Sequence, residues 1–195
     1  MQHNLSEINE VIRNRRTIFP EQFSGRQVHR ELIDALLENA RWAPSHKLTQ
    51  PWYFKVFAKE GLQRLSAFQA DTYAAITPAD KFNAIKERKL RERPLMASAV
   101  LAVCLRRDPQ ERVPEVEEVA SVAIAVQNMW LTATAYGLGF YWSSGGLTYK
   151  PEMKTFLGLA EADSCLGFVY LGYPDVDWPR GQRRPPEYYS DWVEE

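Results

Sequence analysis

The longest helical pattern in this chain, Glu117 to Tyr136, is apolar on nearly every face of the helix that it predicts. A helix of that kind must be buried all round, and Gly137 supplies a C-terminal cap. Gln127 and Thr132 interrupt the apolar run before it could cross a bilayer. In a chain of 195 residues, such a helix indicates packing against a partner subunit as well as its own sheet.

Charge and cysteine content exclude several classes of protein. The formal net charge is −1, so no overall field attracts nucleic acid or an anionic membrane. The polar N-terminus, residues 1–10, has no apolar signal core, which predicts a cytoplasmic protein. Cys104 and Cys165 each lie inside an apolar run, which favours two buried, reduced thiols over a disulfide or a redox pair.

Apolar spacing predicts the elements of a single domain, residues 1–195, with no repeat or internal boundary. The secondary structure of residues 62–93 is the least clear from the sequence. The alternating charges of 81–93 indicate a solvated, mobile helix. From about residue 174 the chain becomes polar and rich in proline, which predicts a tail lying across a neighbour. The spacing predicts helices at 5–12, 32–40 and 152–157, strands at 52–57, 96–105, 140–143 and 165–173, and a loop at 106–118.

A pair of arginines and a hydroxyl follow the first predicted helix, at Arg15, Arg16 and Thr17. Guanidinium groups donate in a planar fork that suits a phosphate, and the hydroxyl adds a further donor. The simpler alternative is a basic helix end that complements the helix dipole. Arg183, in the basic C-terminal tail, could reach the same anion or remain a solvated cation.

Two prolines, Pro44 and Pro51, stiffen the loop that presents Ser45, His46 and Lys47. An imidazole and an ammonium so placed could donate to an electron-rich ring system. The alternative is an ordinary surface loop with a solvated histidine.

A glycine-rich turn follows the predicted strand at 140–143, where a backbone can approach a flat ligand closely and donate its amides. An ordinary turn between elements is the alternative. The histidines and cysteines have no metal-ligand spacing, and neither a dinucleotide fingerprint nor a nucleophile elbow is present. The turn comprises Trp142, Ser143, Ser144 and Gly145, followed by Gly146.

In this order, the motifs resemble those of the FMN-dependent nitroreductase family over nearly the whole chain. The resemblance rests on Arg-Arg-Thr at 15–17, Pro-Ser-His-Lys at 44–47 and Gln-Pro-Trp at 50–52. Gly-Leu-Gly at 137–139 and Leu-Gly-Tyr-Pro at 171–174 complete it. The His-Lys form of the loop is most similar to the small bacterial NAD(P)H nitroreductases.

The resemblance implies an α+β fold, with a central, mainly antiparallel sheet wrapped by helices, in an intertwined homodimer. It implies two FMN sites, each built from both protomers, with no catalytic side chain because flavin N5 carries the hydride. One chain would supply the phosphate and ribityl contacts and the ring lining, and its partner the Pro-Ser-His-Lys loop. The implied cofactor-binding residues are Arg15, Arg16, Thr17, Ser45, His46, Lys47, Trp142, Ser143, Ser144, Gly145 and Arg183.

The implied reaction passes hydride from NADH or NADPH through the flavin to a nitroaromatic or quinone-type acceptor, by a ping-pong mechanism. Alternatives are dehalogenation, enone reduction or flavin breakdown on the same fold, a flavin-binding sensor or carrier, and a structural dimer without cofactor. Leu48, Phe19 and Trp42 depart from the family pattern and affect flavin tuning and the substrate opening. Whether 62–93 covers the pocket as a lid stays open at this point.

Overall fold

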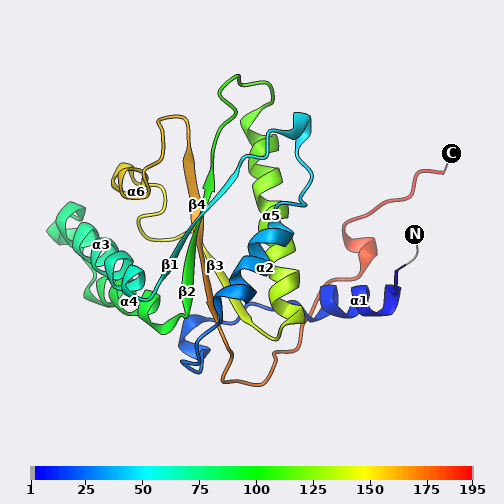
Figure 1. The fold of residues 1–195 in the computed structure, drawn as a ribbon, viewed down its shortest axis with the longest axis horizontal. Coiled ribbons are helices and arrows are strands. Elements are labelled where there is room, and N and C mark those ends of the chain that lie inside the picture. The colour runs from blue at the N-terminus through cyan, green and yellow to red at the C-terminus, as the bar shows by residue number, and fades with distance from the viewer. Residues whose placement is uncertain (1–2, 195) are drawn as a thin grey trace.

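A single antiparallel sheet forms the centre of the computed structural model, which describes residues 3–194 (Figure 1). The strand order is β1-β2-β4-β3, and every neighbouring pair is antiparallel. The four predicted strands and the antiparallel α+β class are therefore confirmed. The strands are β1 (Trp52–Ala58), β2 (Ala99–Leu105), β3 (Gly139–Ser143) and β4 (Ser164–Gly172).

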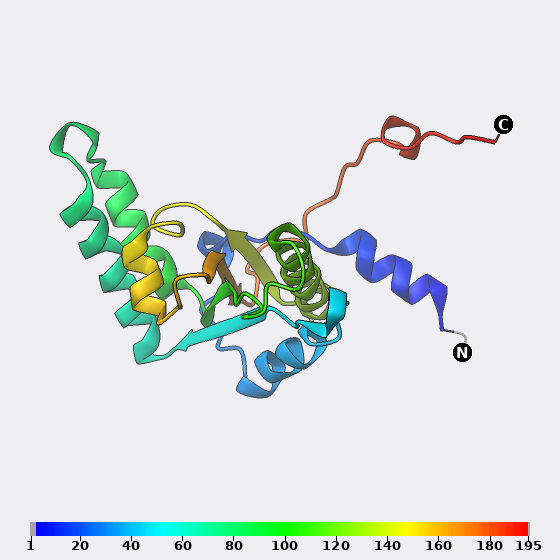
Figure 2. The same cartoon turned by 90° about the horizontal axis from the view of Figure 1, so that it is seen from above.

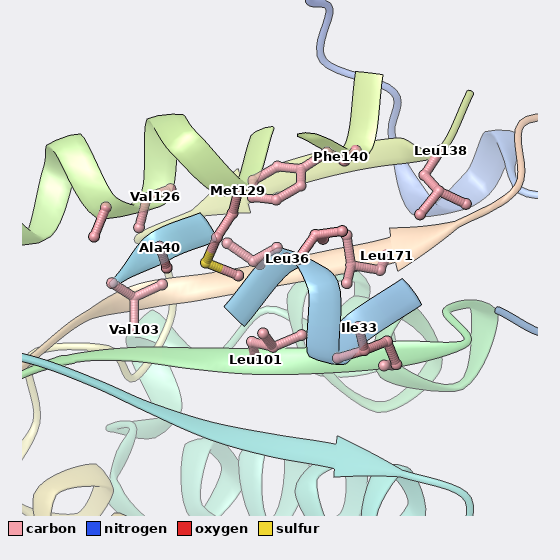
Figure 3. Close-up of a cluster of buried hydrophobic side chains, with 14 of the residues drawn as sticks. Ile33, Leu36, Ala40, Leu101, Val103, Val126, Met129, Leu138, Phe140 and Leu171 are labelled. Carbon is pink, nitrogen blue, oxygen red and sulfur yellow. The ribbon is translucent and has the colours of Figure 1, made fainter. Parts of the chain in front are cut away.

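One face of the sheet is covered by α2 (Arg30–Ala40) and α5 (Glu115–Ala135). Figure 3 shows the apolar layer between these two helices and the sheet, in which Met129 of α5 and Leu36 of α2 point toward Leu101 of the sheet. Burial of each such side chain stabilises the folded protein by roughly 1.5–3 kcal/mol. This layer fixes α5 against the sheet along most of its length.

The opposite face is covered by α3 (Glu60–Ile76) and α6 (Pro151–Leu157), and α4 (Ala84–Met96) packs against α3 (Figure 2). The charged stretch at 81–93 is therefore mostly one helix of an α-helical hairpin. The predicted strand at 96–105 begins too early, because Met96 still belongs to α4 and Ala97 caps that helix.

Strand β2 is buried on both faces, as its continuous apolar sequence predicts. Its odd-numbered residues contact the α2 and α5 layer, and Val100, Ala102 and Cys104 contact the α3 and α6 layer. The strand therefore joins the two cores of the molecule.

Helix α1 (Leu5–Asn14) and the C-terminal tail both extend from the same side of the body (Figure 2). Asn4 caps α1 by accepting a hydrogen bond from the amide of Ser6. The helix buries none of its residues in this chain. Short 3₁₀ turns occur at Pro20–Gln22, His46–Leu48, Ala79–Lys81 and Pro186–Tyr188.

Helix α5 is longer by two residues at its start than the predicted helix, and the preceding loop ends correspondingly earlier. Gly137 follows it with φ of 66°, which confirms the predicted cap. The single chain does not bury the helix all round. Val116, Ala120, Ile124 and Gln127 form an exposed stripe at helical spacing, with Val116 73% exposed.

Within residues 3–194, no helix is both long and apolar enough to span a membrane. The same residues contain no group of three or more histidine, cysteine, aspartate or glutamate side chains that could hold a metal ion.

Candidate functional site

Arg15, Arg16 and Thr17 are half-buried and directly follow α1, where the chain turns to run beside β3. The guanidinium of Arg15 lies 4.5 Å from the centre of the Trp130 ring on α5. The indole Nε1 of Trp130 donates to the carbonyl of Arg16 at 2.9 Å. Trp130 therefore anchors both arginines near the C-terminal end of α5.

The C-terminal tail folds back over Arg16. Arg16 Nε donates to the carbonyl of Pro179 at 2.8 Å, and Trp178 Nε1 donates to the carbonyl of Asn14 at 2.6 Å. The Arg16 guanidinium lies directly against Gly181, so a side chain at this position would have to displace it. Beside Arg16 is an open hollow of about 690 Å³, lined also by Trp178 and Arg180.

Arg15, Arg16 and Arg183 have no carboxylate partner in the described chain. No aspartate or glutamate of residues 3–194 forms an ion pair with any of them within 4.0 Å. Burial lowers the pKa of Arg15, and the charges of Arg183 and Arg16 lower it further. Positive charges held together without a counter-ion favour the binding of an anionic ligand. Because Nε and Nη1 of Arg16 already donate to backbone carbonyls, Arg16 would meet a phosphate through Nη2, beside the guanidinium groups of Arg15 and Arg183.

The loop between the two prolines has an unusual backbone. Lys47, Leu48 and Gln50 all have positive φ, between 47° and 53°. Ser45 Oγ accepts a hydrogen bond from the amide of Gln50 at 3.2 Å and closes the loop. Left-handed conformations at non-glycine residues carry strain and cluster at functional sites. Thr49 Oγ1 is buried here without a partner.

The exposed side chains of this loop contact the start of α5. His46 Nδ1 lies 2.5 Å from Glu117 Oε2, and Lys47 Nζ donates to the carbonyl of Arg112 at 2.9 Å. The loop is therefore held at the N-terminal end of α5 by one charged and one backbone partner.

A buried ion pair supports this end of α5. Arg107 Nη1 donates to Glu118 Oε2 at 2.6 Å, with only 1% of the Glu118 side chain exposed. Glu118 Oε1 also accepts from the amide of Asp108. Arg112 donates to Asp108 Oδ2 at 2.6 Å and lowers the pKa of Asp108 to about 2. Every charge in this network has a partner.

The glycine-rich turn leaves β3 at Ser143, which is half-buried, as is Trp142. Trp142 and Ser144 line a hollow of about 410 Å³, and Trp142 Nε1 is buried without a partner. The Gly145 carbonyl accepts from Thr148 Oγ1 at 2.8 Å. Val119 and Ala123 of α5, Leu166 of β4 and the exposed Tyr149 complete the lining of the hollow.

The arginine group and the loop lie at opposite ends of α5 in one chain (Figure 1). Glu117, which contacts His46, and Trp130, which contacts Arg15, are more than three helical turns apart, or roughly 20 Å. The predicted site residues thus form separate groups within the chain: the arginines, the loop, and the Trp142 turn between them along β3.

The three residues that depart from the family pattern are all exposed. Leu48 is 78% exposed and Trp42 71% exposed, and Trp42 Nε1 donates to Glu38. Phe19 packs on Tyr141 of β3, with ring centres 4.9 Å apart. An ideal Cβ on Gly146 of the turn would lie 3.0 Å from Leu90 of α4, so the helical hairpin borders the turn.

Sequence reasoning missed the residues that position these groups. Trp130 and Pro179 contact the arginines from far along the chain, and Glu117 contacts His46. No local pattern marks such long-range contacts. One local hint was present: Gly181, a glycine inside the basic tail, is typical of a backbone that approaches another group closely.

The nitroreductase family model matches residues 12–173, which is most of the chain. This chain belongs to the nitroreductase family. Membership makes the protein an oxidoreductase and confirms the family resemblance of the motifs. The matched range contains Arg15 and Arg16, the loop and the glycine-rich turn, whereas Arg183 lies beyond it.

Individual relatives of this nitroreductase support the same assignment. YdjA of Escherichia coli K12, named as a proposed NAD(P)H nitroreductase, is 36% identical over 75% of this chain and 78% of its own length. A nitroreductase-like protein of Bacillus cereus is 30% identical and covers all of both chains, with a TM-score of 0.84. A proposed nitroreductase of Desulfovibrio desulfuricans, solved in complex with FMN, is 25% identical, with a TM-score of 0.70, and covers 98% of this chain and 99% of its own.

Proposed function

We propose that this protein is an FMN-dependent oxidoreductase that passes hydride from NADH or NADPH to nitroaromatic or quinone-type acceptors. The observation that supports it most strongly is the group of cations at Arg15, Arg16 and Arg183, which has no carboxylate partner in residues 3–194. An FMN phosphate supplies the missing negative charge. The FMN complex of the Desulfovibrio relative is consistent with this cofactor.

When bound, FMN supplies the electron-transfer chemistry, and the side chains of this protein supply binding, orientation and charge. Arg15 and Arg16 hold the phosphate, with Thr17 beside them and Arg183 closing the clamp. Lys47 and His46 of a second chain would supply donors to the flavin ring. The remaining cofactor contacts come from Ser45 of the loop and from Trp142, Ser143, Ser144 and Gly145 of the turn.

A homodimer would complete the site. Two chains related by a twofold axis perpendicular to α5 would place the His46 loop of one beside the Arg15 group of the other. The exposed stripe of Val116, Ala120 and Ile124 is an apolar surface suited to that contact. Exposed aromatic residues of the tail, including Trp192 at 86% exposure, would pack across the partner.

The hollow beside Trp142 supports a planar, electron-poor acceptor. Its wall combines aliphatic residues with the rings of Trp142 and Tyr149, and aromatic faces pack well on flat ligands. If nicotinamide and acceptor use this same space in turn, the kinetics must be ping-pong. Leu90 of α4 lies beside Gly146 of the turn, and from this contact we infer that the hairpin can act as a lid.

The visible absorbance spectrum of the purified protein, before and after anaerobic addition of NADPH or NADH, tests the proposal. Flavin bands at about one per protomer that bleach on addition are expected. Parallel lines in double-reciprocal plots with a quinone acceptor would support the ping-pong mechanism. Bands that do not bleach would support a sensor or carrier instead, and protein that stays colourless with added FMN would contradict flavin binding.

A further inference from the structure

A β-bulge in the central sheet brings together the two cysteines of the chain. In the register of β2 and β4, Cys104 lies opposite Cys165, whereas Val103 lies opposite Gly167. Leu166 is therefore an extra residue on β4 without a partner on β2. The bulge occurs at the point where both cysteines lie in the sheet.

The bulge also decides which face Cys165 occupies. Side chains alternate along a strand, so Cys165 would otherwise share the α5 face with Val169 and Leu171. The extra residue reverses the alternation, and Leu166 contacts that face while Cys165 joins Cys104 on the other. Gly167 has φ of 136°, which L side chains rarely adopt, so this glycine permits the bulge.

The spacing suits a disulfide. Directly opposed residues of antiparallel strands have Cα atoms about 4.5–5.5 Å apart, and disulfides span about 4.4–6.8 Å. Both cysteines are free thiols in the structure. Both side chains lie in the same buried layer, and Cys165 Sγ donates to the carbonyl of Gly167 at 3.7 Å. Because the two cysteines face each other in the register, no large backbone movement is needed to join their sulfurs.

The two thiols differ in access and in acidity. Cys104 is completely buried, whereas Cys165, although only 5% exposed, lines a hollow of about 320 Å³ together with Lys150 and Lys154 of the α6 segment. The neighbouring Cys165 and burial raise the pKa of Cys104. The neighbouring Cys104 lowers the pKa of Cys165, which is therefore the sulfur that ionises first.

We propose that Cys104 and Cys165 form a dithiol that hydroperoxides convert to an intramolecular disulfide, a modification site distinct from the cofactor site. The Cys165 thiolate attacks one peroxide oxygen, the O–O bond breaks, and hydroxide or alkoxide leaves, which gives a sulfenic acid on Cys165. The Cys104 sulfur then attacks that sulfur, the S–O bond breaks, and the hydroxyl leaves as water with the Cys104 proton. Two thiols are oxidised and one hydroperoxide is reduced.

The test exposes the folded protein to excess hydrogen peroxide, removes the peroxide, and then unfolds the protein in the presence of N-ethylmaleimide to block the remaining thiols. The intact mass is then measured. The expected product has lost two hydrogen atoms, carries no maleimide and remains a single chain on a non-reducing gel. Because the chain contains only two cysteines, such a product identifies the Cys104–Cys165 bond. Two maleimides after peroxide, or disulfide-linked pairs of chains, would overturn the proposal.

Single variants test the order of the steps. Cys104→Ser should stop at a sulfenic acid that dimedone traps on Cys165, and Cys165→Ser should leave Cys104 unmodified. Dimedone on Cys104 of Cys165→Ser, at the rate seen for Cys165, would contradict the assigned attacking sulfur. Circular dichroism checks that each variant is folded, and the wild-type experiment stands without them.

Discussion

The two ends of α5 differ in how the charged side chains around them are paired. At the N-terminal end, Arg107 and Arg112 each have a carboxylate partner, Glu118 and Asp108. At the other end, Arg15 stacks on Trp130 in the company of other arginines and has no such partner in the described chain. Paired charges hold a structure together, whereas unpaired charges of one sign are stabilised by a ligand. The first end is thus a scaffold for the His46 loop, and the second a binding site.

The largest expected effect is on the scaffold end. Glu118→Ala leaves Arg107 buried without its partner and should lower the free energy of unfolding by about 3–5 kcal/mol. Urea unfolding at fixed protein concentration measures it. Glu115→Ala, on the exposed first turn of the same helix, is the matched control and should change stability by less than about 1 kcal/mol. Equal losses for the two variants would contradict the distinction.

Removing a cation from the binding end should weaken the binding of FMN without changing the stability of the fold. Arg183→Ala should raise the dissociation constant of FMN by roughly 10- to 100-fold, because a hydrogen bond to a charged group contributes about 1.5–3 kcal/mol. The unfolding free energy of the FMN-free protein should change by less than about 0.5 kcal/mol. Fluorescence titration measures the affinity. Arg30→Ala, on exposed α2 surface, should alter neither quantity.

Acid should break the scaffold end selectively. The pKa of Asp108 is lowered from 3.8 to about 2 by Arg112, so its contribution is complete above about pH 4 and disappears as the pH falls through about 2. The melting temperatures of wild type and Asp108→Asn should therefore differ at pH 5 and converge toward pH 2. Circular dichroism melts check this. A constant difference across that range would refute the assignment, and the exposed Asp80→Asn is the control.

The smallest expected effect is stabilisation of the FMN-free protein by inorganic phosphate. At a concentration equal to its dissociation constant, phosphate should stabilise the wild type by about 0.4 kcal/mol. Thermal melts in phosphate and in chloride at matched ionic strength measure it. The increment should vanish in Arg16→Ala, and its persistence there would place phosphate elsewhere.

Local patterns in the sequence predicted much of the fold, because strand β2 is continuously apolar and Gly137 marks the end of α5. They predicted the arginines as phosphate donors, but not that Trp130 and Pro179 hold them. Those contacts join residues more than a hundred positions apart. The face occupied by Cys165 was equally hidden, since it depends on one extra residue in β4. The shared site remains a prediction because it needs a second chain.

The most direct test of the central claim is a comparison of FMN with riboflavin, which lacks the phosphate, on wild type and Arg15→Ala. Titrations of the FMN-free protein give four dissociation constants. The account predicts that wild type binds FMN at least about tenfold more tightly than riboflavin, and that this ratio shrinks by about tenfold or more in the variant, mostly through FMN. Equal binding of FMN and riboflavin to the wild type would contradict a phosphate site at the arginines.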